Sequence, residues 1–167
     1  YEYPISYQNR PLIIQTPIIY IPYSTFKVDN KITFDFYFSN LDKDEDMFLL
    51  CELILNLDEK VIHKVNSRPK IKSGKKKQRR SPKREFISNV KRQRQSCLNE
   101  KPDKMRVSLF NTIKVFNNLS QPISIDNVKG KASMKLLLCP TKIWINKGKF
   151  GIFWEVLQIK MYPKPEL

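Results

Sequence analysis

The chain has 167 residues, the usual length of a single domain, so we expect one domain over residues 1–167. Its 31 Lys and Arg residues against 16 Asp and Glu residues give a net charge of +15, which predicts a polyanionic partner such as nucleic acid, an anionic membrane surface or an acidic protein. Three widely spaced cysteines without a Cys/His cluster, and the lack of a long apolar run, argue against disulfides, a zinc site and a membrane span.

The N-terminal part of the chain predicts two strands. Residues 12–23 are apolar and β-branched but are interrupted by Pro17 and Pro22, which indicates a broken or edge strand. Residues 31–38 alternate strictly between apolar and polar side chains, which is typical of a half-buried strand. The apolar members are Ile32, Phe34, Phe36 and Phe38.

An amphipathic helix is expected over about 42–66. Acidic residues between Asp42 and Asp46 suit a helix N-terminus, where the backbone dipole is positive. Apolar residues then recur every three or four positions, and the helix should end before Pro69. The apolar stripe consists of Met47, Leu50, Ile54, Leu57, Val61 and Val65.

A very basic insert follows over residues 68–98. Between Arg68 and Arg94 thirteen residues are basic and one is acidic, so we expect a flexible loop without regular structure. Such a loop binds phosphates without reading sequence, and it also fits a nuclear-localisation signal. The expected phosphate contacts are Lys75, Lys76, Lys77, Arg79, Arg80, Lys83 and Arg84.

Residues 105–116 predict a strand with one apolar side and one side that alternates cations and rings. Arg106, Phe110, Lys114 and Phe116 lie on the second side, and Asn111 interrupts the apolar side. Cations for phosphates and flat rings for unpaired bases are what a single-strand binder needs. The alternative is that Phe110 and Phe116 pack beneath the helix or the basic insert.

The C-terminal third predicts more strands. We expect a short strand at 123–125, a strand at 130–138 closed by Pro140, and a hairpin of 142–145 and 150–159 around a turn with Gly148. Trp144 faces away from its apolar neighbours and is a further stacking candidate. Tyr20, Tyr23 and Phe26 are weaker stacking candidates, while Phe153 and Trp154 are expected in the core.

No arrangement of residues predicts catalysis, a cofactor or a metal ion. The segment 73–76 lacks the glycine and the hydroxyl residue of a phosphate-binding loop. His63 is the single histidine and falls on the charged side of the helix, so no Cys/His pair is available elsewhere. We therefore expect a mainly β, non-enzymatic domain: a small OB-like barrel of five to seven strands with one helix, or a β-sandwich.

Two segments resemble a known family. Residues 15–23 read Gln-Thr-Pro-Ile-Ile-Tyr-Ile-Pro-Tyr, and residues 143–159 read Ile-Trp-Ile-Asn-Lys-Gly-Lys-Phe-Gly-Ile-Phe-Trp-Glu-Val-Leu-Gln-Ile. Their order and spacing are similar to those of the OB-fold single-stranded DNA-binding proteins of large nucleocytoplasmic DNA viruses, such as African swine fever virus and giant viruses. The resemblance covers about residues 15–161 and departs at the basic insert.

The resemblance implies a protein that coats single-stranded DNA during viral replication, recombination or repair. We expect binding with little sequence preference, self-association, and a location in the host cytoplasm at the viral factory, in the nucleus or in the virion. The alternatives are a virion nucleoprotein that binds packaged duplex DNA or an acidic partner, and an RNA-binding module.

Overall fold

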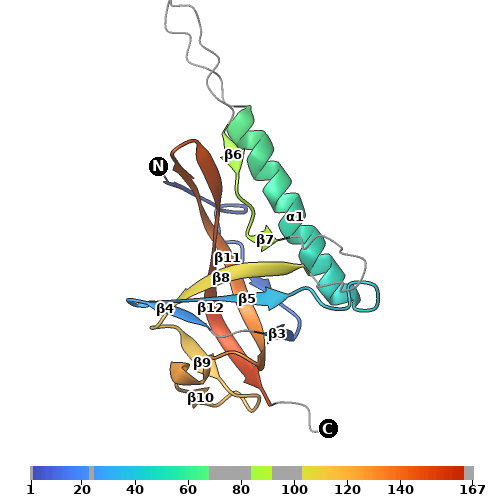
Figure 1. The fold of residues 1–167 in the computed structure, drawn as a ribbon, viewed down its shortest axis with the longest axis vertical. Helices are drawn as coiled ribbons and strands as arrows, with labels where there is room; N and C mark the ends of the chain where they lie inside the picture. The colour runs from blue at the N-terminus through green and yellow to red at the C-terminus, as the bar shows by residue number, and fades with distance from the viewer. Residues whose placement is uncertain (1, 23–24, 68–83, 92–102, 164–167) are drawn as a thin grey trace, which may run out of the picture.

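A long antiparallel hairpin forms the centre of the protein. In the computed structural model, which describes residues 2–22, 25–67, 84–91 and 103–163, strand β11 (Ala132–Asn146) pairs with β12 (Lys149–Tyr162). The turn between them has positive φ angles at Lys147 (48°) and Gly148 (77°), as a two-residue hairpin turn requires. The predicted hairpin is confirmed, and Figure 1 shows it running along the length of the barrel.

The other strands complete a curled sheet around this hairpin. The main path runs β1 (Glu2–Pro4), β11, β12, β8 (Lys104–Phe110), β5 (Lys31–Tyr37) and β4 (Phe26–Val28). Two short strands, β2 (Ile14–Gln15) and β3 (Ile19–Ile21), pair with β11, and β3 also contacts β5. This mainly β, OB-like architecture is the one expected, and the described residues contain the one expected α-helix (Figure 1). They form twelve strands instead of five to seven, because many of the strands are only two or three residues long.

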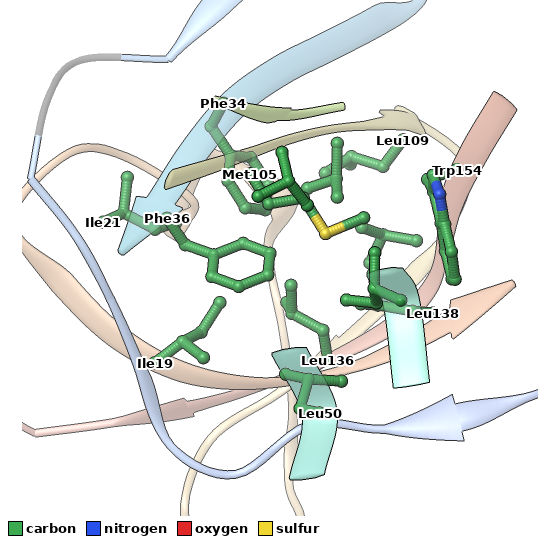
Figure 2. Close-up of a cluster of buried hydrophobic side chains, with 14 of the residues drawn as sticks. Ile19, Ile21, Phe34, Phe36, Leu50, Met105, Leu109, Leu136, Leu138 and Trp154 are labelled. Atoms are coloured by element: carbon green, nitrogen blue, oxygen red, sulfur yellow. The ribbon is translucent and has the colours of Figure 1, made fainter. Parts of the chain in front are cut away.

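Alternating apolar side chains of β5, β8, β11 and β12 fill the inside of the sheet. Phe34 and Phe36 of β5 are fully buried, and Trp154 of β12 lies at the other side of the same core (Figure 2). Helix α1 (Glu45–Asn66) covers this core with the apolar stripe that the sequence predicted. The helix begins at Glu45, because the Asp44 side chain caps it by accepting a hydrogen bond from the Met47 amide at 3.1 Å.

The strand expected over 105–116 is two strands. Residues 111–113 form a turn between β8 and β9 (Lys114–Phe116), and the Asn111 amide donates to the Asn30 carbonyl at 2.9 Å. β9 pairs with β12 and with β10 (Pro122–Ile123), which is followed by a 3-10 turn at Ile125–Asn127 instead of more strand. The break occurs at Asn111, the polar residue on the apolar side.

Pro140 does not end its strand. β11 continues through it because the pairing with β12 shifts register between Pro140 and Lys142, and a proline is tolerated at such an irregularity. The Thr141 carbonyl at this point accepts a hydrogen bond from the Ile5 amide at 3.0 Å. Two predicted strands are therefore one strand of 15 residues.

The basic insert was expected to be flexible throughout, and this is wrong for residues 84–91. They form β6 (Glu85–Phe86), which pairs with β12, and β7 (Val90–Lys91), which pairs with β8. The Phe86 ring packs against Phe150 at 5.2 Å, and Val90 is buried. These apolar side chains anchor the segment despite its charge, whereas residues 68–83 and 92–98 lie outside the described residues.

Candidate nucleic-acid interface

The outer face of β5 and β8 carries the polar residues that alternate with the core. Register pairs place Lys31 opposite Phe110, Thr33 opposite Ser108 and Asp35 opposite Arg106. Residues directly opposite in an antiparallel pair share one face, so these six side chains form a two-column surface. The Thr33 and Ser108 hydroxyl groups are hydrogen-bonded to each other at 3.1 Å.

Arg106 is on this face, as predicted, but its charge is compensated. Its Nε and Nη2 donate to the Asp35 carboxylate at 2.8 and 3.2 Å, and Lys104 Nζ lies 3.6 Å from the same carboxylate. Burial acts to raise the pKa of Asp35, but Arg106 and Lys104 outweigh it and hold that pKa below its usual value. Asp35 competes with phosphate for both cations.

Phe110 is exposed, so the alternative that it packs beneath the helix or the insert is wrong. Its side chain is 43% exposed at the end of β8. The side chain of its cross-strand neighbour Lys31 extends to β12, where Nζ lies 4.2 Å from the centroid of the Phe153 ring. Lys31 thus links two aromatic rings on the outer face.

Phe153 is the functional candidate that the sequence did not predict. It was expected in the core with Trp154, but it is only partly buried, and Lys142 Nζ of β11 is a second cation over its ring at 5.3 Å. Trp154 is 1% exposed, as expected. Both faces of β12 are apolar in sequence, so only the pairing of Lys142 with Phe153 shows which ring faces outward.

Trp144 lies beside this site on β11. A Cβ atom at the opposite residue, Gly151, would be 2.8 Å from Trp144 Cζ2 and 2.7 Å from the Ile87 carbonyl oxygen, so the indole lies directly over the glycine. Lys142, two residues earlier, is on the same face and forms a 2.8 Å ion pair with Glu2. We name Lys31, Phe110, Lys142, Trp144 and Phe153 the Phe153 cluster.

Lys114 and Phe116 belong to a second group, farther along β12. Their register partners there are Gln158 and Lys160. The ammonium groups of Lys135 and Lys160 each lie 5.9 Å from the Tyr162 ring centroid. A hollow of about 350 Å³ over β11 and β12 is lined by Lys135, Gln158, Lys160 and Tyr162 among others. Lys114 is exposed, and Phe116 is half-buried.

The remaining predicted site residues are distributed as follows. Arg84 is exposed immediately before β6. Of the weaker stacking candidates, Tyr20 is 44% exposed and Phe26 is 63% exposed on β4, opposite Thr33. Six of the predicted phosphate contacts and Tyr23 lie outside the described residues, namely Lys75, Lys76, Lys77, Arg79, Arg80 and Lys83.

Helix α1 has a different surface. Its first turn is acidic, and Phe48, Leu49 and Leu53 are exposed among acidic residues, so this surface disfavours phosphate. His63 is exposed, as predicted. Within the part of the chain that the structure describes, no helix has the length and apolar character needed to cross a bilayer, and no three His, Cys, Asp or Glu residues are placed to hold a metal ion.

The fold is similar to that of phage single-stranded DNA-binding proteins. The protein from bacteriophage Enc34, solved in complex with single-stranded DNA, superposes with a TM-score of 0.59 at 12% identity over 92% of this chain and 88% of that chain. The protein gp2.5 of bacteriophage T7 superposes with a TM-score of 0.57 at 8% identity over 93% and 96% of the two chains. No family model and no curated protein matches the sequence. At these identities the likeness establishes the fold.

Proposed function

We propose that the protein binds single-stranded DNA with little sequence preference. The observation that carries the proposal is the Phe153 cluster, in which three aromatic rings and two lysines from four strands share the outer face of the sheet. Rings offer stacking surfaces that every base can use, and lysines offer point charges for the phosphates. The phage protein with this fold and bound single-stranded DNA supports the same assignment.

The strand would follow the outer face of β12. This face leads from the Phe153 cluster to Lys160 and Tyr162, a distance of about 30 Å at the usual rise of a β-strand. The cations of residues 68–83 would add affinity that depends on salt and not on sequence.

The biological setting is a further proposal. The resemblance of residues 15–23 and 143–159 to proteins of large nucleocytoplasmic DNA viruses supports a role in viral DNA replication, recombination or repair. The protein would then reside at the viral factory in the host cytoplasm, in the nucleus or in the virion. Imaging of a fluorescent fusion together with labelled viral DNA in infected cells tests this proposal.

The deciding experiment is a fluorescence-anisotropy titration with oligo-dT, oligo-U and a duplex of equal length across a salt series. It uses the intact chain and a variant in which residues 70–82 are replaced by a Gly-Ser linker, because residues 84–91 belong to the sheet. We expect the variant to keep its preference for oligo-dT, with a shallower salt dependence. Preference of the intact chain for duplex would instead favour a packaging protein, and preference for oligo-U an RNA-binding module.

Self-association stays a prediction, and we propose that it takes place along a bound strand. Sedimentation of the intact chain with and without a long oligo-dT strand checks it. Complexes that hold several chains per strand, formed at concentrations below single-site saturation, are the expected result.

A further inference from the structure

We propose that Phe153 is a base-stacking position and that Lys31 and Lys142 are its two flanking phosphate contacts. This inference rests on the proposed function and names the nucleotide subsite within it. Three separate strands converge on the ring: β12 supplies Phe153, β5 supplies Lys31 and β11 supplies Lys142.

The position of the two ammonium groups supports this assignment. Lys31 Nζ lies 4.2 Å and Lys142 Nζ 5.3 Å from the same ring centroid, close enough for both to be attracted by the π-electrons. A buried structural phenylalanine needs no such partners. The lysines therefore occupy a ring surface that would otherwise be open to solvent or to a flat ligand.

An unpaired nucleotide carries both chemical groups that this arrangement fits. Its base has a π-face that stacks on phenylalanine, and its phosphates attract ammonium groups more strongly than a benzene ring does. On binding, the base would replace a lysine over the ring, and each lysine would turn to the phosphate on its own side. Lysine suits this exchange because its ammonium group sits on a flexible four-carbon stem.

The two lysines are held to different degrees before binding. Besides its contact with Phe153, the Lys142 ammonium group forms the 2.8 Å ion pair with Glu2. The Lys31 ammonium group makes its cation-π contact with Phe153. Glu155 lies two residues from Phe153 on β12 and is opposite Ser108 of β8. Its carboxylate would disfavour phosphate directly beside it, so the ammonium groups of Lys31 and Lys142 are the favoured phosphate contacts at this ring.

The test separates the base from the backbone. Phe153→Leu keeps an apolar side chain but removes the ring, and its affinity is measured for oligo-dT and for an abasic strand of the same length. We expect about a 10-fold loss for oligo-dT and no change for the abasic strand. Phe153→Tyr, which keeps a ring, should restore oligo-dT binding.

Matched variants complete the test. Lys31→Gln and Lys142→Gln should each lower the affinity for oligo-dT and for the abasic strand by the same factor. Each should also reduce the steepness of log affinity against log salt by about 0.7. Phe48→Leu removes a ring that is 45% exposed on α1 and should change neither affinity. If Phe153→Leu lost the same affinity for oligo-dT and for the abasic strand, or lost affinity for neither, the stacking assignment would be overturned. Single-strand binding by the protein would be left intact. Failure of the unmodified protein to bind oligo-dT would instead refute the proposed function.

Discussion

Arg106 makes a two-bonded ion pair with Asp35 across strands β8 and β5, with nitrogen–oxygen distances of 2.8 and 3.2 Å. The strand pattern placed Arg106 on the outer face of the sheet correctly, but the pattern could not show that an acidic residue faces it. The Arg106 side chain is 44% exposed, and solvent screening on that side limits the contribution of the pair to stability to about 1 kcal/mol. The pair therefore matters more for binding, because it keeps a cation away from phosphate.

Asp35→Asn should strengthen single-strand binding. Removing the carboxylate releases Arg106 from its ion pair and takes one partner from Lys104, so we expect affinity to rise about 3-fold at low salt and the salt slope to steepen by about 1. A salt series of anisotropy titrations measures both quantities. Asp126→Asn makes the same charge change in the exposed 3-10 turn and should have a much smaller effect. Equal effects would mean that net charge alone is responsible.

The Asp35→Asn variant should also change the response to acid. The pKa of the Asp35 carboxyl is lowered in the folded protein, so its contribution to stability is present above about pH 4 and is lost as the pH falls through the folded value. An asparagine side chain at this position cannot titrate. The unfolding free energy of the variant, measured by urea denaturation between pH 2 and 6, should therefore depend less on pH than that of the unmodified protein. Identical profiles would contradict this reasoning.

Phe110→Ala should weaken oligo-dT binding without unfolding the protein. The ring is 43% exposed, so its removal costs little packing, whereas a lost stacking contact lowers affinity by about 10-fold. Phe116→Ala on β9 should add to the loss if the strand continues along β12, and it should cost some stability because that ring is half-buried. Unchanged affinity of the double variant, measured well below its melting temperature, would refute stacking by these two rings.

Gly151→Ala should displace Trp144. The new methyl group would lie 2.7 Å from the Ile87 carbonyl and 2.8 Å from the indole, so we expect a loss of roughly 1–3 kcal/mol in stability. The displaced indole should also shift the tryptophan emission spectrum. In a Trp144→Phe background the spectral shift should disappear, since Trp154 is buried elsewhere. A spectral shift that persists there would assign it to Trp154 and not to Trp144.

Asp58→Asn should stabilise the protein at neutral pH. Asp58 is 5% exposed, and burial raises its pKa despite a 2.7 Å hydrogen bond from the Ser88 hydroxyl. A raised folded pKa means that stability is greatest below about pH 4 and is lost as the pH rises through the folded value. The amide of the substituted side chain keeps an acceptor for Ser88 without the charge. Urea denaturation should show an advantage of the variant at pH 7 that shrinks toward pH 4; a lower stability at both pH values would contradict it.

Elements with strong local signals could be predicted from the sequence. The helix was predictable because Asp44 caps it and apolar residues follow at helical spacing, and the β11–β12 hairpin because Gly148 lies between two apolar runs. The strand break at Asn111 was visible only as one polar residue on an apolar side. The continuation through Pro140 could not be predicted, since it depends on how Thr141 is accommodated against β12.

The candidate site was predictable only in part. Phe110 and Trp144 alternate with apolar neighbours, which shows their direction, and both are on the outer face. Phe153 has apolar residues on both sides, so only the cross-strand partners Lys31 and Lys142 reveal its position. Residues 84–91 likewise form strands because of contacts with β12 and α1. These contacts cannot be predicted from the number of charged residues in the segment.

The position of β11 in the chain has a consequence for biosynthesis. β1 pairs with β11, and Glu2 and Lys142 are 140 positions apart. After β1 has been synthesised, it therefore stays unpaired until the residues up to β11 have also been synthesised. At 5–20 residues per second this delay is about 7 to 28 s. β5 likewise cannot pair with β8 until β8 has been made, whereas the β4–β5 hairpin and α1, among the described elements before β8, can form from neighbouring residues. The apolar faces of the early strands are therefore exposed until residues 132–146 have left the ribosome, and a slow codon placed before residue 132 would lengthen that exposure.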